Sequence, residues 1–197
     1  MKNIVVCLFC FVGILPVNAQ SLKQNSQQFK QSNENLMLGL GSWAVTNFIG
    51  SGIGWNQSES VRWKSFHQMN VFWNVVNAGL AIPGYIKAKK QPVFQDEVVF
   101  KKEQLKTERL FLFNSGLDLI YITSGALLMG TAHKKPETQE RNLGFGQGII
   151  VQGGFLLAFD ATAYFVHRHL RIHGTSTKLS KLSIAPAGTG IRMSWSL

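Results

Sequence analysis

Two aspartates lie near the middle of long apolar stretches, where a carboxyl group is costly and therefore informative. Asp118 lies inside 110–130 and Asp160 inside 145–166, and neither stretch contains a lysine or arginine that could pair with the acid. An acid at such a position in a membrane helix faces the protein interior or a wet cavity. There it can hold a proton, a cation or a small polar ligand, so the sequence places a candidate site at these two residues.

Amides and a tyrosine share helix faces with the acids. Asn70, Asn74 and Asn77 recur at i, i+4 and i+7, and Asn114, Asp118 and Tyr121 repeat that spacing, so each set falls on one face. The candidate site residues are Asp118, Asp160, Asn74, Asn77, Asn114, Tyr121 and Asn47. Two interpretations fit the pattern. The cluster binds a ligand, or it only fixes helix packing, because any bundle keeps its polar groups inward.

Four apolar stretches must position these residues. They cover about 36–55, 69–86, 110–130 and 145–166. In antiparallel membrane helices, Asn47, Asn77, Asp118 and Asp160 would share one depth, roughly 12–16 Å from the same side. The fold expected is all-α, a four-helix transmembrane bundle with a short C-terminal β-hairpin, since Ile191, Met193, Trp195 and Leu197 alternate with polar residues.

The chain divides into four segments by composition. They are a signal peptide (1–19), a polar leader disordered at its start (20–35), the four-helix membrane domain (36–173) and a β tail (174–197). The signal consists of Lys2, an apolar core and small residues ending at Ala19. Both cysteines precede Gln20, so the chain that follows has no disulfide or thiolate metal site.

Composition and charge indicate a membrane and its lipids. Charged residues make up 15% of the chain, fewer than in soluble domains, and the net charge is +10. The basic residues flank apolar stretches, which favours anionic lipid headgroups over nucleic acid as partner. The headgroup candidates are Arg168, Arg171, His169, Lys89 and Lys90. A protein partner could dock on 87–109 or on 174–197.

The location expected is the bacterial inner membrane, with the orientation left open. Most basic residues belong to what we call the basic end, formed by 20–35, 87–109 and the C-terminal tail. A signal peptide and four spans would place this end outside the cytoplasm, against the positive-inside tendency. An uncleaved first segment, a first stretch that does not cross, or a bundle outside the inner membrane would each remove this conflict.

No pattern of a known catalytic or cofactor site is present. The chain lacks G-x-S-x-G, the P-loop and G-x-G-x-x-G, and its two aspartates lack the Tyr-Asp and Gly-x-Gly-Asp motifs of presenilin-like proteases. His169 and His173 have chelating spacing, but Arg168 and Arg171 beside them would repel a cation. We expect no enzyme, no metal and no cofactor.

Several short strings together resemble a known family. They run from His67 through Trp73 to Asn77, from Asn114 to Asp118, and include Gln152-Gly-Gly154 and Phe159-Asp160. Over roughly 36–167 the chain resembles small uncharacterised bacterial multi-span membrane proteins with a domain of unknown function. The resemblance implies no activity. The function expected is a small integral membrane protein with a buried polar cluster, or alternatively a non-catalytic assembly or interaction subunit.

Overall fold

Long helices build almost all of the described structure. The computed structural model describes residues 14–174, 182–187 and 190–195. Its helices are α2 (Ile14–Gln57), α3 (Val61–Lys90), α4 (Glu97–Thr131) and α5 (Gln139–His173), with short 3-10 turns η1 (Ala132–Lys134) and η2 (Pro136–Thr138) before α5. Asp96 caps α4, because its side chain accepts hydrogen bonds from the backbone N–H groups of Val98 and Val99.

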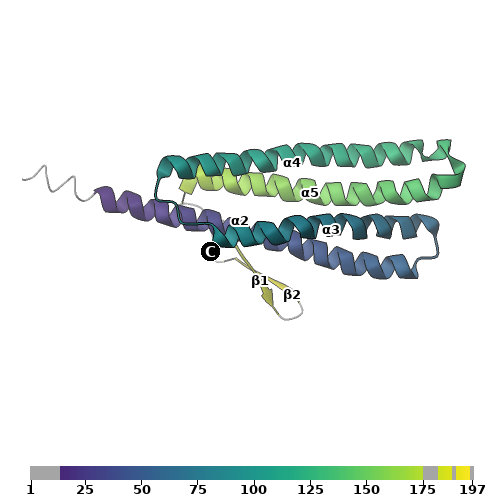
Figure 1. The fold of residues 1–197 in the computed structure, drawn as a ribbon, viewed down its shortest axis with the longest axis horizontal. Helices are drawn as coiled ribbons and strands as arrows, with labels where there is room; N and C mark the ends of the chain where they lie inside the picture. The colour runs from purple at the N-terminus through teal and green to yellow at the C-terminus, as the bar shows by residue number, and fades with distance from the viewer. Residues whose placement is uncertain (1–13, 175–181, 188–189, 196–197) are drawn as a thin grey trace, which may run out of the picture.

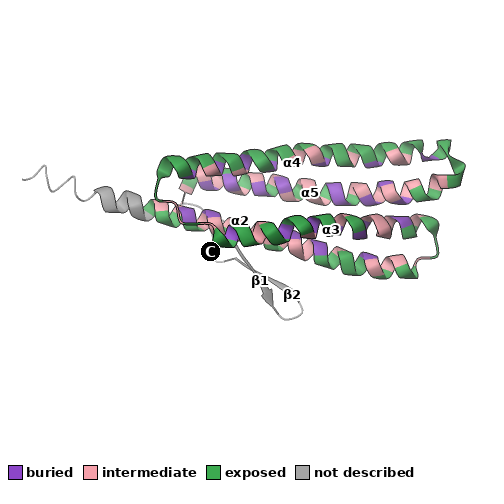
Figure 2. Ribbon diagram, viewed as in Figure 1, coloured by how far each residue is buried: buried purple, intermediate pink, exposed green. Residues whose placement is uncertain are grey.

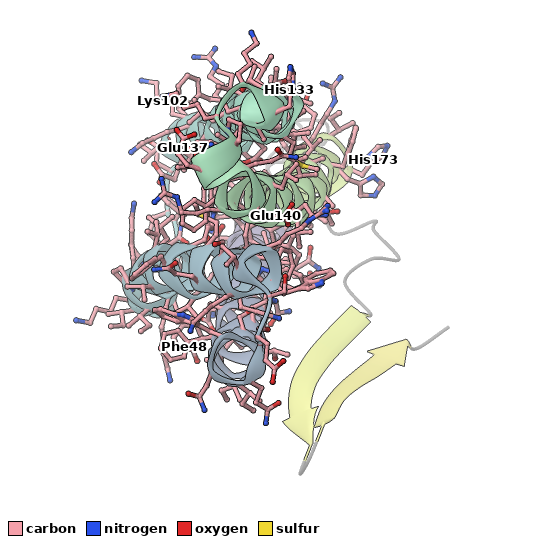
Figure 3. All side chains as sticks on the ribbon, turned by 90° about the vertical axis from the view of Figure 1, so that its right-hand side faces the viewer. Phe48, Lys102, His133, Glu137, Glu140 and His173 are labelled. Carbon is pink, nitrogen blue, oxygen red and sulfur yellow. The ribbon has the colours of Figure 1, made fainter. Side chains whose placement is uncertain are left out.

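The helices form two antiparallel hairpins that stack on each other (Figure 1). One hairpin is α2–α3 and the other is α4–α5, and α3 packs on α5 to join them. The view along the helices shows the order α4, α5, α3, α2, with His133 at the α4 side and Phe48 pointing away from the bundle at the α2 side (Figure 3). The inner helices α3 and α5 therefore carry most of the contacts between the hairpins.

Glycines on α5 allow it to approach both neighbouring helices closely. A Cβ on Gly144 would overlap the carbonyl oxygen of Arg62 on α3. A Cβ on Gly125 of α4 would lie 2.8 Å from the carbonyl oxygen of Gly146. Both distances are too short for a side chain, so these positions accept only glycine at the present helix separation.

The polar leader is a structural part of α2, so the prediction that it is disordered at its start was wrong. Phe29 is fully buried, with its ring 5.6 Å from Phe100 and 5.0 Å from His167. The Ser26 hydroxyl accepts a hydrogen bond from the Phe94 backbone at 2.9 Å. One buried aromatic ring within a polar stretch thus anchors the leader against α4 and α5. Most of the predicted signal peptide (1–13) lies outside the described residues.

The predicted fold class needs a correction at its C-terminal end. Strands β1 (Leu182–Ala187) and β2 (Gly190–Trp195) pair antiparallel with each other. The packing that defines the fold is between helices, and the strands add no layer to it. The fold is therefore all-α, without a β-hairpin component. The alternating pattern of the tail describes only local pairing, which is marginal without packing against another element.

The bundle buries many polar side chains and exposes many apolar ones. Figure 2 shows exposed residues along the outer helix faces and buried residues between the helices. Asn70, Gln152 and Asp118 are buried, whereas Phe72, Phe113 and many other large apolar side chains are exposed. Among the described residues, three helices are long and apolar enough to cross a membrane: Ser21–Gln57, Glu97–Lys134 and Pro136–His173. Helix α3, which carries three asparagines, is not among them, so this finding supports three of the four expected spans.

Candidate functional site

The structure places Asp118 and Asp160 next to each other in the interior. Asp118 lies on α4 and Asp160 on α5, and their carboxyl groups interact with each other, with Asn114 interacting with Asp160. The residues are only 2% and 5% exposed. Two carboxyl groups that interact in a buried site cannot both ionise readily, so the pair in this geometry carries at most one negative charge.

The two acids have no basic partner among the described residues. None of the ion pairs in the described chain involves Asp118 or Asp160. The Oδ2 atom of Asp118 is buried and has no hydrogen-bond partner within the described structure. A buried oxygen without a partner costs free energy unless a ligand, an ion or water satisfies it. The acid pair therefore has unused capacity to bind.

A cavity of about 960 Å³ opens beside the acid pair. Helices α3 and α4 supply most of its lining, and parts of α2, of the α3–α4 connection and of α5, including Phe159 and Asp160, complete it. Beside the acids, the ring of Trp73 on α3 meets the ring of Tyr121 on α4 edge to face at 5.0 Å. At the basic end the lining includes Lys87 and Lys90. The volume is within the range of pockets that bind small organic molecules, and the walls are mostly apolar.

A separate network of amides joins α2, α3 and α5. The Gln152 side chain donates to Asn70 Oδ1 at 2.5 Å and accepts from Asn77 at 3.3 Å and from the Trp43 indole at 3.2 Å. Asn77 also donates to Asn74 at 3.1 Å. Since these amides satisfy one another, the network needs no ligand, and it fixes the packing of the three helices.

The structure thus divides the predicted cluster. Asn114 and Tyr121 lie with the two acids around the cavity. Asn74 belongs to the amide network, whereas Asn77 belongs to the network and also lines the cavity. Asn47 was expected at the same depth, but it lies outside both groups and donates to the Trp43 carbonyl of its own helix at 3.4 Å.

Three members of the amide network were missing from the predicted site. Asn70 was noted in the sequence only because it shares a helix face with Asn74 and Asn77, Gln152 only as part of a motif, and Trp43 was not considered. A glutamine in the middle of an apolar stretch is a signal of the same kind as the aspartates. The indole of Trp43 gave no such signal, because tryptophan is common in membrane helices for other reasons.

The predicted headgroup residues have partners inside the protein as well. Arg171 forms a two-pronged ion pair with the buried Glu108 of α4, at 2.5 and 3.0 Å. Arg168 donates to the Tyr164 hydroxyl at 2.6 Å, and the His169 ring stacks on His173. Lys89 lies over the Tyr85 ring, and Lys90 lines the cavity. Arg171 is therefore a structural residue, and its role on lipid stays a prediction.

We expect Arg171→Gln to destabilise the bundle by about 1–3 kcal/mol, because it leaves the Glu108 carboxylate buried without its cation. Glu108→Gln combined with Arg171→Gln should recover part of this loss, since the buried charge is then absent. Thermal unfolding of the three proteins in the same detergent measures both effects. A double variant less stable than Arg171→Gln alone would contradict this account of the pair.

Comparison with known proteins assigns the chain to a family. The profile of a family of unknown function (DUF6992) matches residues 39–161. The chain belongs to this family. The DUF6992 match covers both aspartates, the amide network and most of the cavity walls, and it ends before Arg171. The resemblance to an uncharacterised family is therefore confirmed. No curated protein and no solved structure matches the chain.

Proposed function

We propose that this protein is a small integral membrane protein, without enzymatic activity, whose Asp118–Asp160 pair binds a proton and exchanges it for a cation. One observation carries this proposal: two adjacent carboxyl groups, nearly fully buried, border a cavity and have no basic partner among the described residues. A merely structural pair would not need an adjacent cavity or leave the Asp118 Oδ2 atom without a partner.

The physical basis is competition for one site. The proton that the two carboxyl groups share lowers their charge and makes the pair tolerable in a low-dielectric interior. A cation bound beside the carboxyl groups can replace the proton in this role. Binding of the cation and release of the proton are then linked, so each lowers the apparent affinity for the other.

The apolar exterior and the basic end support a location in a membrane with anionic headgroups. Exposed side chains such as Phe113 and Leu127 would face lipid chains. Exposed Lys89 and Lys90 lie at one end of the bundle, where phosphate groups would neutralise them. We propose the bacterial inner membrane as the site, with the protein oriented by these residues.

The proton on the pair is testable by infrared spectroscopy. Purified protein in lipid nanodiscs should show a carbonyl band of a protonated carboxyl group, and Asp118→Asn combined with Asp160→Asn should remove it. Glu137→Gln, which changes an exposed carboxyl at the other end of the bundle, is the matched control and should leave the band intact.

Two results would contradict the proposal. If the band persists unchanged in a folded double variant, then another group holds the proton and the proposed site is wrong. If the double variant folds, has lost the band and neither it nor the wild type responds to any cation, the pair only fixes helix packing. The alternative of an assembly subunit would then explain the protein better.

A further inference from the structure

We propose that the cation is a lipophilic organic ammonium ion or a similar organic cation, taken up from the bilayer between α3 and α4. This inference rests on the proposed function and names the ligand class of the same site. The charge would lie at Asp118 and Asp160, and the apolar groups would lie against Trp73, Tyr121 and Phe159, all of which line the cavity.

The walls of the cavity suit an organic cation better than a metal ion. No group of three or more His, Cys, Asp or Glu side chains that could hold a metal ion occurs among the described residues. Asn114 and Asn77 take part in their contacts through N–H groups, so their amide oxygens are the only oxygen ligands they could add to the two carboxyl groups. An inorganic cation would depend on these few oxygens and on water within mostly apolar walls, whereas an ammonium group needs only the carboxyl groups and aromatic faces.

Aromatic rings lie where such a cation requires them. Trp73 and Tyr121 approach from opposite walls, edge to face, beside the acids. Phe159 precedes Asp160 and also lines the cavity. Aromatic faces attract organic cations electrostatically and also bury their apolar groups, and this attraction is larger away from water. The unpartnered Oδ2 of Asp118 provides the charge complement.

The rim of the cavity points to entry from lipid. Val76, Leu80 and Leu110 line the cavity and are nevertheless 59%, 60% and 55% exposed. Their outward surface is apolar, so a molecule dissolved in the bilayer meets no polar barrier. At the basic end, Lys87 and Lys90 outnumber the one acid that lines the cavity there, Glu103, so the local net positive charge disfavours a hydrated cation approaching from water. The two ends of the cavity therefore favour a lipophilic cation over Na⁺.

The exchange balances in charge. The pair holds one proton and one negative charge before binding, and two negative charges beside the organic cation afterwards, so one proton is released for each cation bound. Titration of the protein with tetraphenylphosphonium in weakly buffered solution should therefore lower the pH. The amplitude should vanish in Asp118→Asn combined with Asp160→Asn.

Equilibrium binding of radiolabelled tetraphenylphosphonium to the full chain in zwitterionic nanodiscs tests the proposal directly. We expect saturable binding that weakens about 10- to 100-fold in Asp160→Asn, because a charge-assisted contact is lost. Tetraphenylborate, an anion of the same shape, is the matched ligand control and should not bind saturably. Trp73→Leu should weaken binding about 3- to 30-fold without touching either acid.

The outcomes separate this inference from the function on which it rests. Saturable tetraphenylborate binding, or equal tetraphenylphosphonium affinity in wild type and in a folded Asp160→Asn variant, overturns the inference. Proton release caused by Na⁺ with no tetraphenylphosphonium binding overturns it as well, but leaves proton–cation exchange standing. Loss of the infrared band in the double variant, without proton release by any cation, overturns both.

Discussion

Replacing Gly144 by alanine should destabilise the bundle by about 3 kcal/mol or more, the largest effect we expect from a single added methyl group. The new Cβ would overlap the Arg62 carbonyl oxygen and lie 2.9 Å from the Ser65 Cβ, both on the first turns of α3. The Arg62 carbonyl cannot rotate away as a flexible side chain could. Helix α3 must therefore move away from α5, and this separates the two hairpins.

The chain offers a matched control ten residues further along α5. Gly154 has no atom within 4 Å of an added Cβ, so Gly154→Ala places the same methyl group in open space. It should be neutral or stabilising by about 1 kcal/mol, because alanine favours helix more than glycine does. Thermal unfolding of both variants in one detergent gives the comparison. Equal stability of the two variants would show that α3 and α5 are not held at this distance.

The glycines of α5 show which features of helix packing can be predicted from the sequence and which cannot. The fourth stretch opens with Gly144, Gly146 and Gly148, a composition that permits close packing of helices in lipid. The partner of each glycine could not be predicted, because Gly144 meets α3 whereas Gly146 meets α4. Residues at neighbouring positions of one helix face different neighbours, and only the order of the helices in space assigns them.

Residue counting placed the two acids at a similar depth, and the structure puts them side by side. The two acids meet because Asp118 and Asp160 lie on consecutive antiparallel helices that pack on each other. The same counting included Asn47, which faces its own backbone instead. Depth along a helix follows from the 1.5 Å rise per residue, but direction around the helix depends on which neighbours exist.

The packing of the leader and the Glu108–Arg171 ion pair at the basic end could not be predicted from the sequence, and the reason differs from that for Asn47. Their partners are distant in sequence, as Phe29 is from His167 and Glu108 is from Arg171. The composition of 20–35 resembles that of disordered segments, and a single buried ring does not change it noticeably. Only the packed structure shows that Phe29 occupies the space between α4 and α5.

Gln152→Leu should destabilise the bundle by about 2–4 kcal/mol, since it removes the residue on which three other side chains converge. Asn70, Asn77 and Trp43 each have a hydrogen bond to Gln152, and both asparagines are only 1% exposed. Leucine has a similar volume, so the loss reports unpaired polar groups and not a cavity. The estimate lies below the sum of three bonds, because hydrogen bonds between membrane helices contribute less than their geometry suggests.

Asn47→Leu is the matched control for this prediction. It makes the same kind of change on α2 but breaks only a bond of 3.4 Å to the backbone of its own helix, so stability should change by less than about 0.5 kcal/mol. Chemical unfolding of both variants in mixed micelles measures the difference. The infrared band of the acid pair should survive in folded Gln152→Leu, because neither acid contacts the network through Gln152. A band lost together with Gln152 would mean that the amides and the acids act as a single site.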